Sequence, residues 1–275
     1  RKIRTQKFQI EDQRDKLDLQ NKKINSSIQY AQNIQQAILP TSKQLDKHFE
    51  YFLTYKPKDI VSGDFYWYVE FNNRVYIASI DCTGHGVPGA FMSMIGSRLL
   101  NEIVIEKNIL DPAKILSTLN DKIITALRQN ETENEDGMDV CLLCFEDINQ
   151  KNKAIYTGAK RPLLIYRSDK KSIEEIKGDR LAIGGSKNEN RDKDFTSHSI
   201  NINKGDIVFL SSDGLTDQNN ADRKRFGSQR LNDLVINNSH KNLIDLKAII
   251  ESELEIFKQG EEQRDDITLI GLKIK

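Results

Sequence analysis

The chain has 275 residues, 37% of them hydrophobic, and its 41 basic and 41 acidic side chains give a formal net charge of zero. This length suffices for one large core, or for one domain with an appendage. The charge balance excludes a global electrostatic field that attracts nucleic acid or an anionic membrane. The sequence contains no run of about 18 apolar residues that would mark a membrane span. The chain begins with Arg1 rather than Met, so we expect it to be part of a longer protein.

Residues 1–39 contain no Gly or Pro and are rich in Lys, Gln, Asn and Asp, which predicts one long helix that ends before Pro40. Apolar residues recur every seven positions, at Ile3, Ile10, Leu17, Ile24, Ala31 and Ile38. The positions three further on are mostly polar, namely Gln6, Gln13, Gln20, Ser27 and finally Ile34. A strong coiled coil has apolar residues at both sets, so this seam predicts weak self-association.

The end of this helix carries a denser apolar stripe, formed by Ile24, Ile28, Ala31, Ile34 and Ile38, which predicts docking on another surface. We interpret residues 1–40 as a signalling linker that pairs two chains into a homodimer and joins an upstream sensor domain to residues 41–275. The alternative is a solvated helix without a function.

The remainder of the chain mixes strands with helices. Strands are predicted at Phe65–Phe71, Arg74–Asp81, Met138–Phe145, Ala154–Tyr156, Leu163–Tyr166, Ile207–Ser211 and Ile267–Ile274. Helices are predicted from Pro88 to about Lys107, from Asp111 and Pro112 to Arg128, and from Asn242 to Lys258. Helices and hairpins in separate blocks predict an α+β fold of sheets flanked by helices, and not a doubly wound parallel sheet.

Three cysteines argue against a disulfide scaffold and favour a reducing, cytoplasmic location. Cys141 and Cys144 have the spacing of a redox motif. They lie in a predicted strand, however, where side chains three residues apart point to opposite faces. We therefore expect both to pack as small apolar residues.

Four aspartates stand in short apolar or glycine-rich settings, three of them at the edge of a predicted strand: Asp64, Asp81, Asp213 and Asp265. Any one of them is compatible with a simple turn, because Asp before Gly is a common turn signal. Carboxylates that gather from strand ends repel one another unless a cation lies between them. Oxygen ligands alone favour Mg²⁺ or Mn²⁺ over zinc, so the set predicts a metal-dependent hydrolase.

The ordered motifs resemble the SpoIIE-type branch of the PP2C (PPM) serine/threonine phosphatases over roughly residues 45–275. They are Val61–Trp67, Asp81–Ala90, Ser211–Asp217, Arg225–Gly227 and Asp265–Leu269, and the Asp-x-x-Gly-His-Gly-x-Pro-x-Ala stretch from Asp81 is the most specific. The resemblance implies a PP2C-like α-β-β-α sandwich, in which two antiparallel sheets lie between helical layers. It also implies two bound Mn²⁺ or Mg²⁺ ions that activate a water for phosphate ester hydrolysis.

The resemblance further implies a role for each aspartate. Asp81 is expected to bridge the two metal ions, with the main-chain carbonyl of Cys82 completing one coordination shell. Asp64 is expected to hold the other ion, directly or through water.

Further along the chain, Asp213 and Asp265 match ligands of one ion. Asp266 is the ligand instead of Asp265 if the register is shifted by one residue. Asp217 matches a position that binds a third, weaker ion in some relatives.

Two departures from the eukaryotic pattern limit the transfer. Thr83 stands where those relatives have a histidine, so the general-acid role does not carry over, and we expect His85 to shape the turn between Gly84 and Gly86. The phosphate-binding arginine of the eukaryotic relatives has no match in the segment before Asp64.

The resemblance implies a phosphoserine/phosphothreonine protein phosphatase of bacterial signalling, with phosphorylated anti-sigma-factor antagonists as its usual substrates. One alternative is a catalytically silent module that keeps the fold and only binds partners, but all four aspartates are present. The other is a metal-dependent nucleotide hydrolase, which the lack of a base-stacking or phosphate-cradle motif disfavours.

Overall fold

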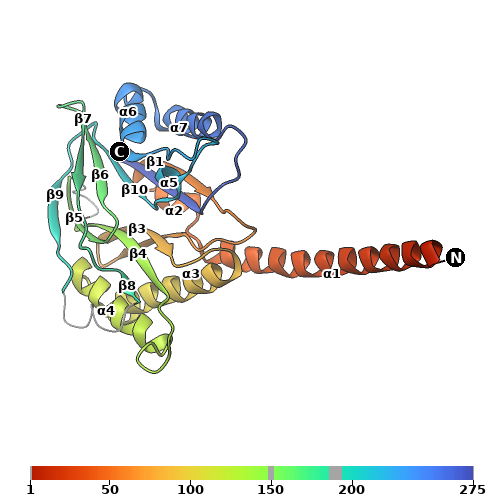
Figure 1. The fold of residues 1–275 in the computed structure, drawn as a ribbon. Coiled ribbons are helices and arrows are strands. Elements are labelled where there is room, and N and C mark those ends of the chain that lie inside the picture. Colours follow the sequence, from red (N-terminus) through yellow and green to blue (C-terminus); the bar gives the residue numbers. More distant parts are fainter. Residues whose placement is uncertain (1, 148–151, 186–193, 275) are drawn as a thin grey trace.

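The computed structural model describes residues 2–147, 152–185 and 194–274, without the side chains of residues 2–5 and 8. The predicted seam position Ile3 therefore lies outside the described side chains. Two antiparallel sheets stack face to face, helices cover their outer faces, and a long N-terminal helix projects away from them (Figure 1). This is the predicted α-β-β-α sandwich.

The strands of the first sheet run in the order β1 (Phe49–Lys56), β11 (Ile267–Ile274), β10 (Ile207–Ser211), β6 (Leu163–Arg167) and β7 (Ser172–Ile176). Those of the second run β2 (Phe65–Phe71), β3 (Arg74–Cys82), β4 (Gly137–Phe145), β5 (Lys153–Ala159) and β9 (His198–Asn201), and β8 (Ile183–Gly184) pairs with β4. All predicted strands are confirmed. The longer strands that were not predicted, β1, β7 and β9, are edge strands, which tolerate mixed polar and apolar residues because one side has no partner strand.

The helices are α1 (Lys2–Ile38), α2 (Ser42–Asp46), α3 (Gly86–Asn101) with the π-helical turn η1 (Glu102–Glu106), α4 (Pro112–Ala126), α5 (Gly214–Asp217), α6 (Ser228–Asn238) and α7 (Leu243–Lys258). The helices α3 and α4 pack on the second sheet, whereas α6 and α7 pack on the first. A third apolar cluster fills the space between the sheets. Among the residues that the structure describes, no helix combines the length and the apolarity needed to cross a membrane.

Local sequence signals set the starts of two predicted helices, α4 and α7. The side chain of Asp111 accepts the backbone N–H of Lys114 at 3.0 Å, with Pro112 at the first helical position. The Asn242 side chain likewise accepts the N–H of Asp245 at 2.8 Å. The short helices α2, α5 and α6 were not predicted.

Strand β4 shows why its cysteines are structural. Cys141 packs in the cluster between the sheets, and Cys144 packs on the opposite face, toward α3 and α4. Both thiols are buried and free, and burial raises the pKa of each. The expected packing role is confirmed.

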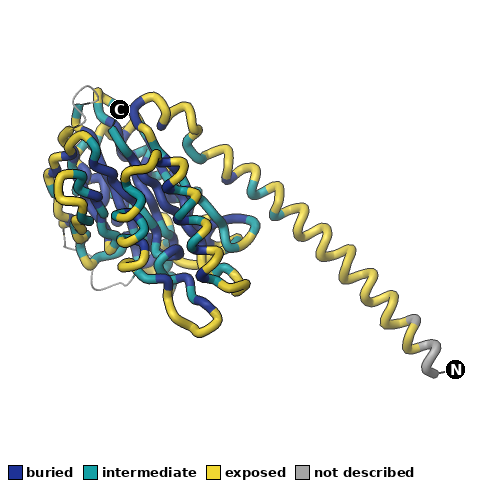
Figure 2. The backbone as a smooth tube through the Cα atoms, turned by 90° about the horizontal axis from the view of Figure 1, so that it is seen from above, coloured by how far each residue is buried: buried dark blue, intermediate teal, exposed yellow. Residues whose placement is uncertain are grey.

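Helix α1 ends at Ile38, before Pro40, and is exposed along most of its length (Figure 2). Its last turns contact α3. Most of the predicted docking stripe does not dock on this domain, because Ile24, Ile34 and Ile38 stay 57%, 41% and 37% exposed. The docking face is centred instead on Gln35, which is 3% exposed and forms hydrogen bonds across the contact.

Candidate metal centre

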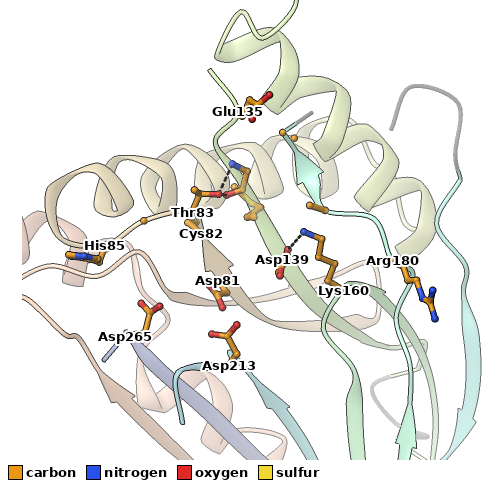
Figure 3. Close-up of a pocket in the computed structure, with 16 residues that line it drawn as sticks. Asp81, Cys82, Thr83, His85, Glu135, Asp139, Lys160, Arg180, Asp213 and Asp265 are labelled. Atoms are coloured by element: carbon orange, nitrogen blue, oxygen red, sulfur yellow. Dashed lines mark hydrogen bonds and ion pairs between the residues drawn. The ribbon is translucent and has the colours of Figure 1, made fainter. Parts of the chain in front are cut away.

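Four aspartates from both sheets line one cleft, and their carboxylates face a common space (Figure 3). They are Asp81 in β3, Asp139 in β4, Asp213 after β10 and Asp265 before β11. A Cβ on Gly214 would lie 1.9 Å from the carbonyl oxygen of Asp266, so only glycine allows these two chain segments to approach so closely. The turn after β10 and the segment before β11 thereby present their aspartates side by side.

Asp139 is the member of this group that was not predicted from the sequence. The register of β3 and β4 places it directly opposite Asp81. Like charges at directly opposed positions destabilise a sheet unless a cation offsets them. The signal that could have revealed it is a carboxylate inside the otherwise apolar strand segment Met138–Phe145.

Arg161, in the loop between β5 and β6, was not predicted either. Its Nη2 lies 2.6 Å from Asp213 Oδ2 and 3.1 Å from both Asp81 Oδ2 and Asp139 Oδ2. The neighbouring Lys160 Nζ is 3.7 Å from Asp139 Oδ1 but is half-exposed. One partly buried positive charge therefore faces three carboxylates, and the group keeps an excess of negative charge.

The pKa values in the group reflect this excess. Burial, followed by the charges of Asp213, Asp139 and Asp265, raises the pKa of Asp81 to about 7, against the lowering effect of Arg161. Burial also raises the pKa of Asp139. Although burial alone would lower the pKa of Arg161, Asp81 and Asp213 raise it, so the guanidinium stays charged. Carboxylates with raised pKa values in a cleft indicate a site that is short of positive charge.

Asp64, which precedes β2, is 2% exposed. Its Oδ2 is shielded from solvent and has no hydrogen-bond partner among the described residues. Burial and the nearby Asp81 carboxylate raise the pKa of Asp64 well above its usual value, against the lowering effect of the Ser212 and Thr268 hydroxyls. A buried carboxylate oxygen without a donor is costly unless a cation or a water binds it. This environment suits the predicted role of Asp64, directly or through water.

The two consecutive aspartates before β11 have different surroundings. Asp265 is exposed and lines the same cleft as Asp81. Asp266 is 3% exposed, and its two oxygens accept the backbone N–H groups of Lys58 and Gly63, each at 2.7 Å. The Asp266 carboxylate thus fastens the segment before Asp64 to the start of β11. The arrangement favours the register in which Asp265 faces a metal ion.

The glycine-rich turn after β3 lets three stretches of backbone meet. A Cβ on either Gly63 or Gly89 would lie 2.3 Å from the carbonyl oxygen of Gly84. Gly84 and Gly86 have φ values of +80° and +56°, which L-residues rarely adopt. The side chain of Cys82 is buried in the core, so its main chain is the part that can face the cleft.

The turn residue His85 and the predicted ligand Asp217 each have a partner of their own. His85 Nδ1 lies 2.7 Å from Asp59 Oδ2 on the surface, which agrees with a role in shaping the turn. Asp217 Oδ1 accepts a hydrogen bond from Arg225 Nη1 at 3.1 Å. Asp217 is not among the described residues that line the cleft.

The cleft has a volume of about 410 Å³, and its other charged lining residues are Glu135, Lys160 and Arg180. Lys160 points at Asp139, whereas Arg180 points away from the aspartates (Figure 3). Among the described residues, no three His, Cys, Asp or Glu side chains are already spaced to hold a metal ion. The excess of carboxylates and the unpartnered Asp64 oxygen nevertheless fit the oxygen ligands that a hard divalent ion would require.

Comparison with known proteins leads to the same family. Residues 72–275 match the family described as Stage II sporulation protein E (SpoIIE). The phosphoserine phosphatase RsbU of Bacillus subtilis (strain 168) is 27% identical over 257 residues, which cover 92% of this chain and 71% of that protein.

Two solved structures are also similar. The SiaA PP2C domain of Pseudomonas aeruginosa has a TM-score of 0.80 and 32% identity, covering 93% of this chain and 98% of that one. RsbX in complex with magnesium shares the fold with a TM-score of 0.54 and 15% identity, over 83% of this chain and 96% of that one. With its motifs, its two-sheet fold and these relatives, the chain belongs to the SpoIIE family of PP2C-type serine phosphatases.

Proposed function

We propose that this chain is a Mn²⁺- or Mg²⁺-dependent protein serine/threonine phosphatase of bacterial signalling. The observation that carries the proposal is the excess of carboxylates, drawn from both sheets, over the single guanidinium of Arg161. The magnesium bound by the structural neighbour RsbX supports the choice of metal.

Five groups would hold two ions. Asp81 would bridge them, and the main-chain carbonyl of Cys82 would complete one shell. Asp213 and Asp265 would hold one ion, and Asp64 would hold the other directly or through water. When bound, the ions would supply a water activated at neutral pH and would neutralise charge on the phosphoryl oxygens.

The structure extends this proposal at three residues. Asp139 joins the ligand candidates, because it lies opposite Asp81 and faces the same space. Asp266 acts as a positioning residue, because its oxygens already accept two backbone N–H groups. A third, weakly bound ion at Asp217 would require its hydrogen bond with Arg225 to open.

The proposed substrate is a phosphoserine or phosphothreonine on a partner protein that resembles the anti-sigma-factor antagonists, and the proposed location is the cytoplasm. The similarity to RsbU, a phosphoserine phosphatase, supports the substrate class. Lys160 and Arg180 give the cleft the positive charge that an anionic phosphorylated substrate requires. Three free, buried cysteines are compatible with a reducing compartment.

We further propose that α1 pairs two chains and connects them to an upstream sensor domain. Ile10, Leu17 and Ile24 of the predicted seam are 65%, 58% and 57% exposed, so this side of the helix is accessible to a second copy. The adjacent glutamines weaken the seam, so two packings of the pair would differ by only a few kcal/mol.

Gln35 offers a route from α1 to the metal centre. Its Nε2 donates to the carbonyl oxygen of Ser62 at 2.6 Å and to Ser93 Oγ at 2.8 Å, and its Oε1 accepts the N–H of Ser62 at 3.1 Å. Ser62 is two residues before Asp64. A shift of α1 would therefore reach this carboxylate through a single buried contact.

A catalytically silent binding module remains the second candidate, because Arg161 already neutralises part of the site. Hydrolysis of p-nitrophenyl phosphate and of a phosphoserine peptide, with and without Mn²⁺, separates the two. We expect turnover only with Mn²⁺ or Mg²⁺, and its loss in Asp81→Asn. A folded, metal-loaded protein without turnover would establish the silent module instead.

A further inference from the structure

The loop that carries Arg161 is rigidly built. The hydroxyl of Tyr156 donates to the carbonyl oxygen of Arg161, and the N–H of Arg161 donates to the carbonyl oxygen of Ala159 at 2.7 Å. Next to it, Lys160 has a φ of +56°, and its N–H donates to the carbonyl oxygen of Asp179 at 2.7 Å. The surrounding strands therefore fix the direction in which the Arg161 side chain leaves the loop.

The guanidinium of Arg161 makes an unusual set of contacts. One nitrogen, Nη2, meets all three carboxylates, although it carries only two hydrogens. Its Nε is buried and has no hydrogen-bond partner among the described residues. An arginine that serves as a structural clamp uses several of its five N–H groups. Arg161 instead acts as a point of positive charge.

We propose that Arg161 is a resident cation of the metal centre, which competes with divalent ions for Asp81, Asp139 and Asp213 and so sets the metal concentration at which the site loads. This inference rests on the proposed function. Mg²⁺, for example, binds carboxylate oxygens at roughly 2.1 Å. An ion bound to these three carboxylates would therefore need the position between them that Nη2 holds. Two cations at this position would also repel each other.

The competition predicts opposite effects of removing the guanidinium. Without metal, Arg161 is the group that contacts all three partly buried carboxylates, so its loss leaves their mutual repulsion uncompensated and destabilises the metal-free fold. With metal, its loss removes a competitor, so the ion binds more tightly. A purely structural arginine would lower stability in both states. An arginine that only contacts the substrate phosphate would leave metal affinity unchanged.

The test compares Arg161→Gln and Arg161→Lys with the native chain, by calorimetric titration with Mn²⁺ and by thermal unfolding in EDTA and in Mn²⁺. We expect Arg161→Gln to bind Mn²⁺ about tenfold more tightly than the native chain and to have a lower melting temperature in EDTA. The rise in melting temperature on addition of Mn²⁺ should be larger for the variant. Arg161→Lys should be intermediate, because it keeps the charge but loses the planar fork. If Arg161→Gln is unfolded in EDTA, its refolding by Mn²⁺ combines metal affinity with folding stability, so the comparison of Mn²⁺ affinities then rests on Arg161→Lys.

Arg167→Gln is the matched control, because Arg167 also pairs with carboxylates but lies outside the cleft. It should melt earlier by the same amount in both conditions and should keep the native Mn²⁺ affinity. Equal or weaker Mn²⁺ binding by Arg161→Gln would overturn the competition while leaving the metal site intact. Mn²⁺ binding by neither protein would overturn the proposed metal site and this inference with it.

Discussion

Arg161 and Arg167 both place a guanidinium among carboxylates, but the two clusters are built on different principles. Arg167 in β6 contacts Glu174 Oε2 through Nε at 2.6 Å and Asp206 Oδ2 through Nη1 at 2.8 Å. The second oxygen of Asp206 accepts the N–H of Ser168 at 2.9 Å, and the N–H of Asn203 also donates to the carboxylate at 3.0 Å. Burial would raise the pKa of Asp206, but these donors lower it.

The contrast separates a structural cluster from the proposed metal site. Around Arg167, both oxygens of the buried aspartate have donors within the protein, so the cluster is complete as folded. Around Arg161, three carboxylates share one nitrogen, and the pKa values of Asp81 and Asp139 are raised. Such a cluster weakens the fold until a ligand completes it, which is the usual relation between a binding site and stability.

The largest expected effect breaks the functional cluster itself. Asp81→Asn keeps the shape but removes the charge proposed to bridge both ions, so turnover should fall by at least about 100-fold. The same change relieves repulsion in the metal-free protein, which should melt no earlier than the native chain. Phosphopeptide assays and thermal unfolding in EDTA measure the two effects. Near-native turnover at saturating Mn²⁺ would show that the two-metal assignment is wrong.

A second comparison uses the consecutive residues Asp265 and Asp266. Asp265 lines the cleft, whereas both oxygens of Asp266 already have donors within the protein. Asp213→Asn and Asp265→Asn should each raise the Mn²⁺ concentration for half-maximal activity by about tenfold, because each removes a proposed ligand. Asp266→Asn should shift this concentration less and destabilise the fold more, because Asp266 accepts two backbone N–H groups. Titrating activity with Mn²⁺ and measuring melting temperatures gives both rankings. A larger shift of this Mn²⁺ concentration for Asp266→Asn than for Asp265→Asn would show that Asp266 is the ligand.

The pH dependence of stability should have opposite signs in the two clusters. Because the pKa of Asp81 is raised in the folded protein, its contribution to the free energy of unfolding is fully present below the ordinary pKa of about 4. This contribution is lost as the pH rises through about 7. The lowered pKa of Asp206 gives a contribution that is present above about 4 and is lost in acid. Metal-free protein should therefore lose about 1–3 kcal/mol between pH 5 and 8.

Chemical denaturation in EDTA at several pH values measures this loss. Asp81→Asn should flatten the curve, and saturating Mn²⁺ should reverse its slope. An unchanged slope in the variant would assign the pH dependence to groups outside the centre.

The smallest expected effects test whether α1 can act on the carboxylate cluster around Arg161. Gln13→Leu with Gln20→Leu completes the apolar seam, so it should strengthen dimerisation and change activity at fixed Mn²⁺ by a fewfold. Gln35→Leu removes the contact with Ser62, so it should uncouple the change in activity from the change in dimerisation. Sedimentation and Mn²⁺-dependent turnover are the measurements. Tighter dimers with unchanged turnover and metal affinity would make α1 a tether and not a switch.

Much of the molecule follows from local sequence pattern. The apolar segments that became β2, β3, β4, β10 and β11 are central or long strands with clear patterns, and Asp111, Pro112 and Asn242 are local helix-start signals. The order of motifs around Asp64, Asp81, Asp213 and Asp265 was sufficient to identify the family, since each motif is a short contiguous stretch.

Tertiary structure alone decided the rest. Asp139 belongs to the centre because the β3–β4 register places it opposite Asp81, and Arg161 belongs there because the β5–β6 loop reaches the ends of strands from both sheets. Gln35 became the docking residue of α1 because two serines distant in sequence meet its amide. In each case the deciding quantity is the distance between residues far apart in the chain. Strand register and loop packing set that distance, and local periodicity carries no information about either.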